Sequence, residues 1–148
     1  MNIVKAISLA PLPDHVEAHV AVLTERLMQL VRQSLLSQDW GGLRIVHFRL
    51  LSCVPATGAT ITALAEPLSM TKQAVGQFVT QLEQSGHVRL SADQTDRRRR
   101  IVLRTALGDR TVDAVNAAIA GLEHEWATQV GPERYAHFLS VLRELALP

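Results

Sequence analysis

A single hairpin signal interrupts an otherwise helical pattern of apolar residues. Two strand-like runs, 87–90 and 101–104, flank a polar loop that contains four consecutive arginines. Apolar residues recur with helical periodicity on both sides of this hairpin. The sequence therefore predicts a mainly α fold, which is α+β only through the hairpin.

Four helices are predicted before the hairpin. The first covers about residues 12–37, with apolar residues at spacings of 4, 3, 4 and 3, a seam suited to packing along another helix. The second covers about 43–54. Two short helices, 61–66 and 72–85, follow, with Thr60 and Thr71 as N-caps and a turn at residues 67–70 between them. The short helices and the hairpin together form a winged helix–turn–helix pattern.

A second seam appears after the hairpin. Beyond Gly108, apolar residues recur at spacings of 3, 4, 3 and 4 as far as Trp126, and a last helix follows Gly131 and Pro132. A chain of 148 residues forms one domain of ordinary size, 1–148, and does not fully bury two such seams alone. We expect residues 41–105 to form the winged helix–turn–helix lobe, and the long flanking helices, about 11–38 and 108–147, to be dimerisation helices that pack against a second copy.

Composition narrows the class of protein. Apolar residues make up 47% and charged residues 20%, which is typical of a globular chain. No apolar run approaches the roughly 18 residues of a membrane span, and no signal peptide is apparent, so no membrane partner is expected. The single cysteine, Cys53, excludes an intrachain disulfide and favours a reducing, cytoplasmic location.

Positive charge is concentrated in one stretch. Residues 72–110 contain eight basic and four acidic side chains, whereas the whole chain has a net charge of only +1. Such a concentration is typical of a protein that binds a polyanion, although a solvated face is the plainer alternative. Double-stranded DNA is the partner that the helical pattern favours.

The helix after Thr71 presents polar residues on the side opposite its apolar face. Glutamine amides and lysine ammonium groups suit base edges in a major groove, and a glycine would let the backbone approach closely. An ordinary polar helix face is the alternative. The candidate DNA-binding residues of this helix are Thr71, Lys72, Gln73, Gly76, Gln77 and Thr80.

The loop of the hairpin provides the second set of candidates. Arginine gains from the strongly negative potential of a narrow minor groove, and it also pairs with phosphates. The candidates are Arg97, Arg98, Arg99 and Arg100. Asp96 would repel phosphate, so we expect it to pair with a nearby arginine and to support the shape of the wing.

Three motifs in this order resemble the MarR family of bacterial transcription regulators. They are Leu82-Glu83-Gln84-Ser85-Gly86-His87-Val88-Arg89, then Asp93-Gln94-Thr95-Asp96-Arg97-Arg98, and Thr105-Ala106-Leu107-Gly108. The resemblance implies a homodimeric winged helix–turn–helix repressor of an inverted-repeat operator, with Arg98 in the minor groove and Asp96 in an ion pair. It also implies a small aromatic effector. The sequence departs from the family pattern at three places: Arg104 replaces an apolar strand residue, Leu90 stands where the pattern has a basic residue and Arg89 comes one place before it, and Pro67 lies in the turn.

Other site candidates carry weaker signals. His47 and Arg49 are positioned to line an effector pocket of the family type. His15 and His19 have the i, i+4 spacing of zinc ligands, which leaves a metal-responsive regulator as an alternative, although we expect no metal site and no cofactor. Cys53 is a buried thiol or, less simply, a redox sensor.

Two further function classes compete with DNA binding. The chain has no glycine-rich phosphate loop and no nucleophile motif, so we do not expect an enzyme. A helical dimer that binds an acidic protein through its basic patch is the remaining alternative. Salt dependence combined with sequence preference would distinguish a DNA reader from it.

Overall fold

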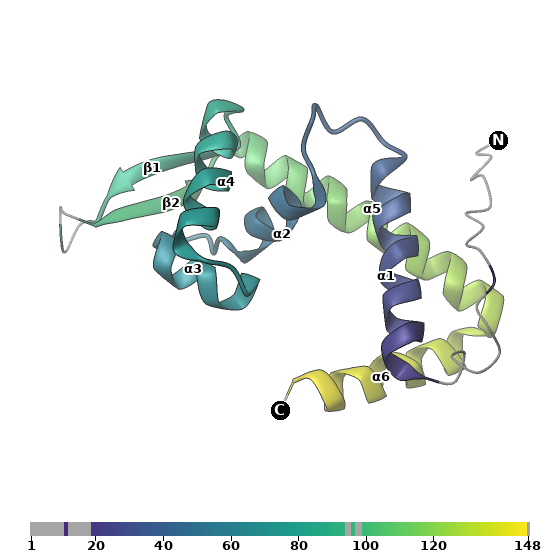
Figure 1. Cartoon of the computed structure of the whole chain (residues 1–148). Helices are drawn as coiled ribbons and strands as arrows, with labels where there is room; N and C mark the ends of the chain where they lie inside the picture. The colour runs from purple at the N-terminus through teal and green to yellow at the C-terminus, as the bar shows by residue number, and fades with distance from the viewer. Residues whose placement is uncertain (1–10, 12–18, 94–95, 97–98, 148) are drawn as a thin grey trace. The chain divides into compact units, whose positions relative to one another are not determined.

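The computed structural model describes residues 11, 19–93, 96 and 99–147. Within them the chain is mainly helical with one small antiparallel sheet, as the sequence predicts (Figure 1). The elements are α1 Val20–Leu36, α2 Ile45–Cys53, α3 Ile61–Leu68, α4 Lys72–Gln84, β1 Val88–Ala92, β2 Arg100–Arg104, α5 Ala106–Val130 and α6 Pro132–Ala146.

The chain divides into two compact units. Residues 39–116 form one, which we call the winged-helix unit, and residues 1–38 with 117–148 form the other, the terminal unit. Helix α5 begins in the winged-helix unit and ends in the terminal unit. The predicted lobe of residues 41–105 thus lies inside the first unit, while the prediction of a single domain stays a prediction.

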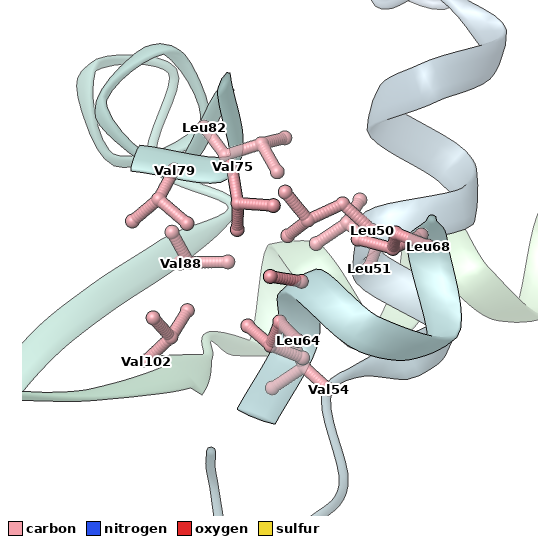
Figure 2. Close-up of a cluster of buried hydrophobic side chains, with 11 residues drawn as sticks. Leu50, Leu51, Val54, Leu64, Leu68, Val75, Val79, Leu82, Val88 and Val102 are labelled. Carbon is pink, nitrogen blue, oxygen red and sulfur yellow. The ribbon is translucent and has the colours of Figure 1, made fainter. Parts of the chain in front are cut away.

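The winged-helix unit has its own hydrophobic core. Side chains from α2, α3 and α4 meet Val88 of β1 and Val102 of β2 (Figure 2). Val75, Val79 and Leu82 recur at i, i+4 and i+7 on α4, so they share one buried face. Complete burial of each such side chain contributes about 1.5–3 kcal/mol. The other fully buried residues are Leu50, Leu51, Val54, Leu64 and Val102.

The wing is a two-stranded ribbon with an additional backbone contact. Its register pairs Val88 with Arg104 and Ala92 with Arg100. Ala59 forms an isolated bridge to Val102, with N–H···O distances of 3.1 and 2.8 Å. The turn before Ala59 requires Gly58, because its φ is +80° and a Cβ there would collide with Ile101 Cγ2.

Several element boundaries differ from the predictions. Helix α3 does not end at Glu66 but continues through Pro67 to Leu68. Proline is tolerated there because it occupies the last turn, where its missing N–H costs a single helical hydrogen bond. Helix α5 begins at Ala106, before Gly108. The predicted start of the first helix, residues 12–18, lies outside the described residues.

The terminal unit contrasts with the winged-helix unit in burial. Among its described residues only Leu35 is buried, although all three of its helices carry apolar seams. Nine large apolar side chains of this unit are exposed, from Phe138 at 38% to Leu145 at 78%. Among the described residues, no helix is long and apolar enough to cross a membrane.

Candidate nucleic-acid interface

Helices α3 and α4 are fixed at their N-termini by the predicted threonine caps. Thr60 Oγ1 accepts a hydrogen bond from Ala63 N at 3.2 Å, and Thr71 Oγ1 accepts one from Ala74 N at 3.1 Å. Ser69, in the left-handed conformation with φ 53°, ends α3. The short turn before Thr71 therefore holds α4 against α3 in a helix–turn–helix arrangement.

The polar face of α4 is free of the core. Lys72, Gln73, Gln77 and Thr80 are all exposed, as the periodicity predicts. Thr80 Oγ1 donates a hydrogen bond to Gly76 O at 3.0 Å, so its hydroxyl oxygen, rather than its proton, is available to a partner. The exposed glutamine and lysine side chains supply the donors and acceptors that base edges require.

Gly76 lies on the flank of α4 and not at the centre of its exposed face. It is half-buried, and a Cβ there would lie 3.9 Å from Ile61 Cδ1, an ordinary contact. The packing of the protein itself therefore does not require glycine at this position. A close approach of DNA to Gly76 stays a prediction.

The described part of the wing tip is held by backbone hydrogen bonds. Asp93 N donates to Arg99 O, and Arg99 N donates to Asp96 O, both at 2.9 Å. Arg99, just before β2, and Arg100, its first residue, are exposed, whereas Arg97 and Arg98 lie outside the described residues. The carbonyl of Asp96 thus helps to shape the tip, and the predicted ion pair of its carboxylate stays a prediction.

A buried histidine connects α2 to α4. His47 is 4% exposed, and its Nε2 lies 2.8 Å from Gln81 Oε1. Its Nδ1 lies 2.9 Å from the backbone nitrogen of Arg44, and its ring meets Phe78 edge-on at 5.5 Å between centroids. Sequence reasoning missed this network, because the two helices are separated by an interval that no local motif encodes.

The terminal unit contains a cavity of about 410 Å³. Three of the six aromatic residues of the chain line it, namely Trp126, Tyr135 and Phe138, together with Arg134 and Gln129. Burial, and then the charge of Glu123, raise the pKa of the Tyr135 hydroxyl, so this group remains a neutral donor. A cavity of this size and lining suits a small organic molecule.

Comparisons with known proteins agree with this geometry. The sequence model of the MarR family matches residues 42–99. In structure, the chain is similar to the PcaV transcriptional regulator of Streptomyces coelicolor in complex with its natural ligand, with 19% identity, a TM-score of 0.69 and coverage of 93% of this chain and 97% of that one. The chain thus resembles the MarR family in sequence over residues 42–99 and has the same fold as this solved MarR-type regulator over most of its length.

Two other solved structures have the same fold as this chain. CouR from Rhodococcus jostii RHA1, bound to p-coumaroyl-CoA, has 20% identity and a TM-score of 0.69, with coverage of 92% and 97%. A mutant of MepR from S. aureus has 20% identity and a TM-score of 0.71, with coverage of 84% and 91%. No curated protein sequence matches the chain significantly.

The structure explains why the MarR-like motif around Thr105 contains a threonine and a glycine. Thr105 Oγ1 donates to Gly86 O at 2.6 Å and accepts from Gly108 N at 3.2 Å. A Cβ on Gly108 would collide with the backbone oxygen of His87. This junction therefore fastens the start of α5 to the end of α4, next to the first strand of the wing.

Arg104, which departs from the MarR pattern, makes two polar contacts within the winged-helix unit. Its Nε lies 2.8 Å from Asp109 Oδ1, an ion pair whose geometry is not that of a good hydrogen bond, and its Nη1 donates to Leu51 O at 3.3 Å. The side chain thus connects β2 with α5 and the end of α2. An apolar residue would lack both contacts.

The remaining candidates are the residues predicted for an effector, redox or metal site. Both ring nitrogens of His47 are engaged, and Arg49 Nη2 donates to Leu68 O at a long 3.5 Å. Cys53 is half-buried against the core. His19 is exposed, His15 lies outside the described residues, and no group of three metal-ligating side chains occurs among the residues described. An effector site at His47 and Arg49 stays a prediction.

Proposed function

We propose that this chain is a regulator of the MarR type, homodimeric and sequence-specific, that represses transcription by binding an inverted-repeat operator in the cytoplasm. The observation that carries the proposal is the exposed polar face of α4, held by its own cap and core beside an arginine-bearing wing. Donors and acceptors on a projecting helix fit the major groove, and arginines at a hairpin tip fit the minor groove. The proposed activity is binding and needs no catalytic group.

Within this proposal, the two elements have different tasks. Lys72, Gln73, Gln77 and Thr80 read base edges, with the N-cap Thr71 and the flanking Gly76 at the entry of the helix. The wing contacts the minor groove and phosphates, supported by Asp96, through Arg97, Arg98, Arg99 and Arg100. Phosphate contacts position the protein and base contacts give it specificity.

The terminal unit supports the proposed dimer. A helical unit whose described residues bury only Leu35 has little core of its own, and its exposed apolar side chains are of the kind that fill a homodimer interface. A two-fold dimer would place its two α4 helices on successive major grooves, about 34 Å apart per turn of DNA. An inverted repeat is the sequence that such symmetry reads.

Selection of bound sequences from a random duplex pool, at two salt concentrations, tests the proposal. We expect enrichment of one inverted repeat that survives the higher salt. Recovery of no motif, with binding that disappears as salt rises, would reduce the arginines to a general basic patch. A protein-interaction module would then be the better explanation.

Two substitutions separate the tasks of helix and wing. Gln77→Ala should relax discrimination at one base position, whereas equal weakening on every sequence would restrict Gln77 to backbone contacts. Arg98→Ala should cost about 1–3 kcal/mol of operator binding, the size of one good groove contact. Unchanged affinity of that variant would contradict the role of the wing.

A response to a small aromatic effector is the second part of the proposal. The cavity in the terminal unit supports it through its size and its aromatic lining, with Arg134 available to an acidic group. In Trp40→Phe the cavity residue Trp126 is the single tryptophan, so its emission reports occupancy. Titration with benzoate should change that emission and weaken operator binding. If the emission instead changes only on dilution of the dimer, the partner chain fills the cavity.

A further inference from the structure

The buried His47 determines how one exposed side chain of α4 is presented. A backbone N–H can only donate, so the Nδ1 that lies 2.9 Å from Arg44 N is an acceptor. The proton of the neutral ring is then on Nε2, which donates to Gln81 Oε1 at 2.8 Å. The oxygen of the Gln81 carboxamide is therefore directed inward and its NH₂ group outward.

This arrangement changes what Gln81 can recognise. A free glutamine pairs with adenine because it donates and accepts at the same time. Gln81 is exposed, but its oxygen is turned toward His47, so the groups that it presents outward are the two N–H donors of its amide. Its partner must therefore be an acceptor.

A positive charge lies on the same surface. Arg44, the exposed residue that precedes α2, places its guanidinium carbon 5.7 Å from the centre of the Phe78 ring. Phe78 is one turn before Gln81 on α4 and contacts the His47 ring, so Arg44 and Gln81 flank one small cluster. The one acidic side chain of α4, Glu83, instead accepts from Leu90 N at 3.3 Å. A cation beside two amide donors matches a phosphate oxygen.

We propose that Arg44 and Gln81 form a phosphate clamp on the DNA backbone beside α4, and that His47 is its positioning residue. The proposal rests on the proposed DNA binding and adds a contact outside both the base-reading residues and the wing. It assigns α2 a part in fixing the register of α4 on the duplex, because phosphate contacts set orientation. His47 acts only through Gln81 and touches no nucleic acid itself.

The first test exchanges the donors of Gln81 for acceptors. Gln81→Glu keeps an oxygen for His47 to hold and removes both amide donors, while Gln84→Glu makes the same charge change at the exposed end of α4. Operator affinity of Gln81→Glu should fall on the order of tenfold more than that of Gln84→Glu, equally on specific and random duplexes. Equal losses in the two variants would overturn the clamp.

The second test counts charges. Arg44→Gln should lower the slope of log K against log salt by about 1, because one phosphate contact is lost. Arg110→Gln removes an exposed arginine of α5 in the same unit, and its slope should match that of the unsubstituted protein. An unchanged slope for Arg44→Gln would remove Arg44 from the clamp.

The third test asks whether His47 acts through Gln81. His47→Leu and Gln81→Met are made singly and together, with thermal melts to follow folding and operator affinity as the readout. The affinity loss caused by His47→Leu should vanish in the Gln81→Met background, since the side chain it positions is gone. Additive losses would make His47 merely structural.

Failure of the phosphate clamp can be distinguished from failure of the proposed DNA binding. If the unsubstituted protein selects an inverted repeat while Gln81→Glu and Gln84→Glu behave alike, DNA binding stands and the clamp falls. If the unsubstituted protein binds no duplex, both proposals fall together.

Discussion

The winged-helix unit and the terminal unit use similar amphipathic helices but bury them differently. Among the described residues, all buried apolar side chains except Leu35 belong to the winged-helix unit. All exposed large apolar side chains except Leu107 belong to the terminal unit. A periodic apolar seam therefore predicts which face of a helix requires apolar contact, but it does not say whether the same chain provides that contact.

The difference assigns the two units different sources of stability. Three helices and a ribbon surround one core in the winged-helix unit, so its stability should be independent of protein concentration. The apolar faces of the terminal unit become stabilising only when another surface covers them, which makes that stability concentration-dependent.

Leu82→Ala should produce the largest loss of stability. An unchanged stability would contradict the burial difference between the two units. Leu82 is 0% exposed in the core of the winged-helix unit, so its truncation leaves a cavity and costs about 2–5 kcal/mol of unfolding free energy. Chemical denaturation at several protein concentrations measures the loss, which should not vary with concentration. Leu36→Ala, at a 61% exposed site of the terminal unit, is the control and should cost little within the monomer.

The local features of the winged-helix unit could be predicted from the sequence. Thr60 and Thr71 are strong N-cap residues, and the 3.6-residue period of Val75, Val79 and Leu82 defines a buried face. The exposed candidates on α4 follow from the same period. These predictions were confirmed because each depends on interactions within one or two helical turns.

Long-range polar contacts could not be predicted. The hydrogen bond between His47 and Gln81 spans 34 residues, and the one between Arg104 and Leu51 spans 53. Whether such groups meet depends on how helices pack, and no local pattern reports it. The end of α3 was predicted wrongly because a proline usually ends a helix. Pro67 lies in the last turn of α3, where the helix tolerates it.

Two glycine substitutions on α5 should change the stability of the protein in opposite directions. Gly108→Ala would drive a methyl group into His87 O, a backbone atom that cannot move aside, and should cost about 1–3 kcal/mol or more. Gly121→Ala, in the terminal unit, has no neighbour within 4 Å and should stabilise by about 0.5–1 kcal/mol through helix propensity. Thermal unfolding of both variants measures the difference, and an unharmed Gly108→Ala would contradict the tight junction.

Leu145→Glu tests what covers the terminal unit. Leu145 is 78% exposed, so the substitution should leave the winged-helix unit folded. A buried charge in a dimer interface should nevertheless raise the dissociation constant of the dimer about tenfold or more, by at least ~1.4 kcal/mol. Sedimentation at a series of concentrations measures that constant. A dimer of unchanged affinity would exclude this part of α6 from the interface.

The smallest expected effect is a pH dependence of the stability of the winged-helix unit. Burial lowers the pKa of His87 below its ordinary value of 6.5, against the opposing effect of its hydrogen bond with the Ser85 backbone. The folded state thus prefers neutral His87, whereas the unfolded chain takes up a proton near pH 6.5. The stabilisation by neutral His87 is complete above that pH and is lost as the pH falls below it. The melting temperature of the protein relative to that of His87→Gln should therefore fall between about pH 8 and about pH 5, because only the histidine loses stability by protonation.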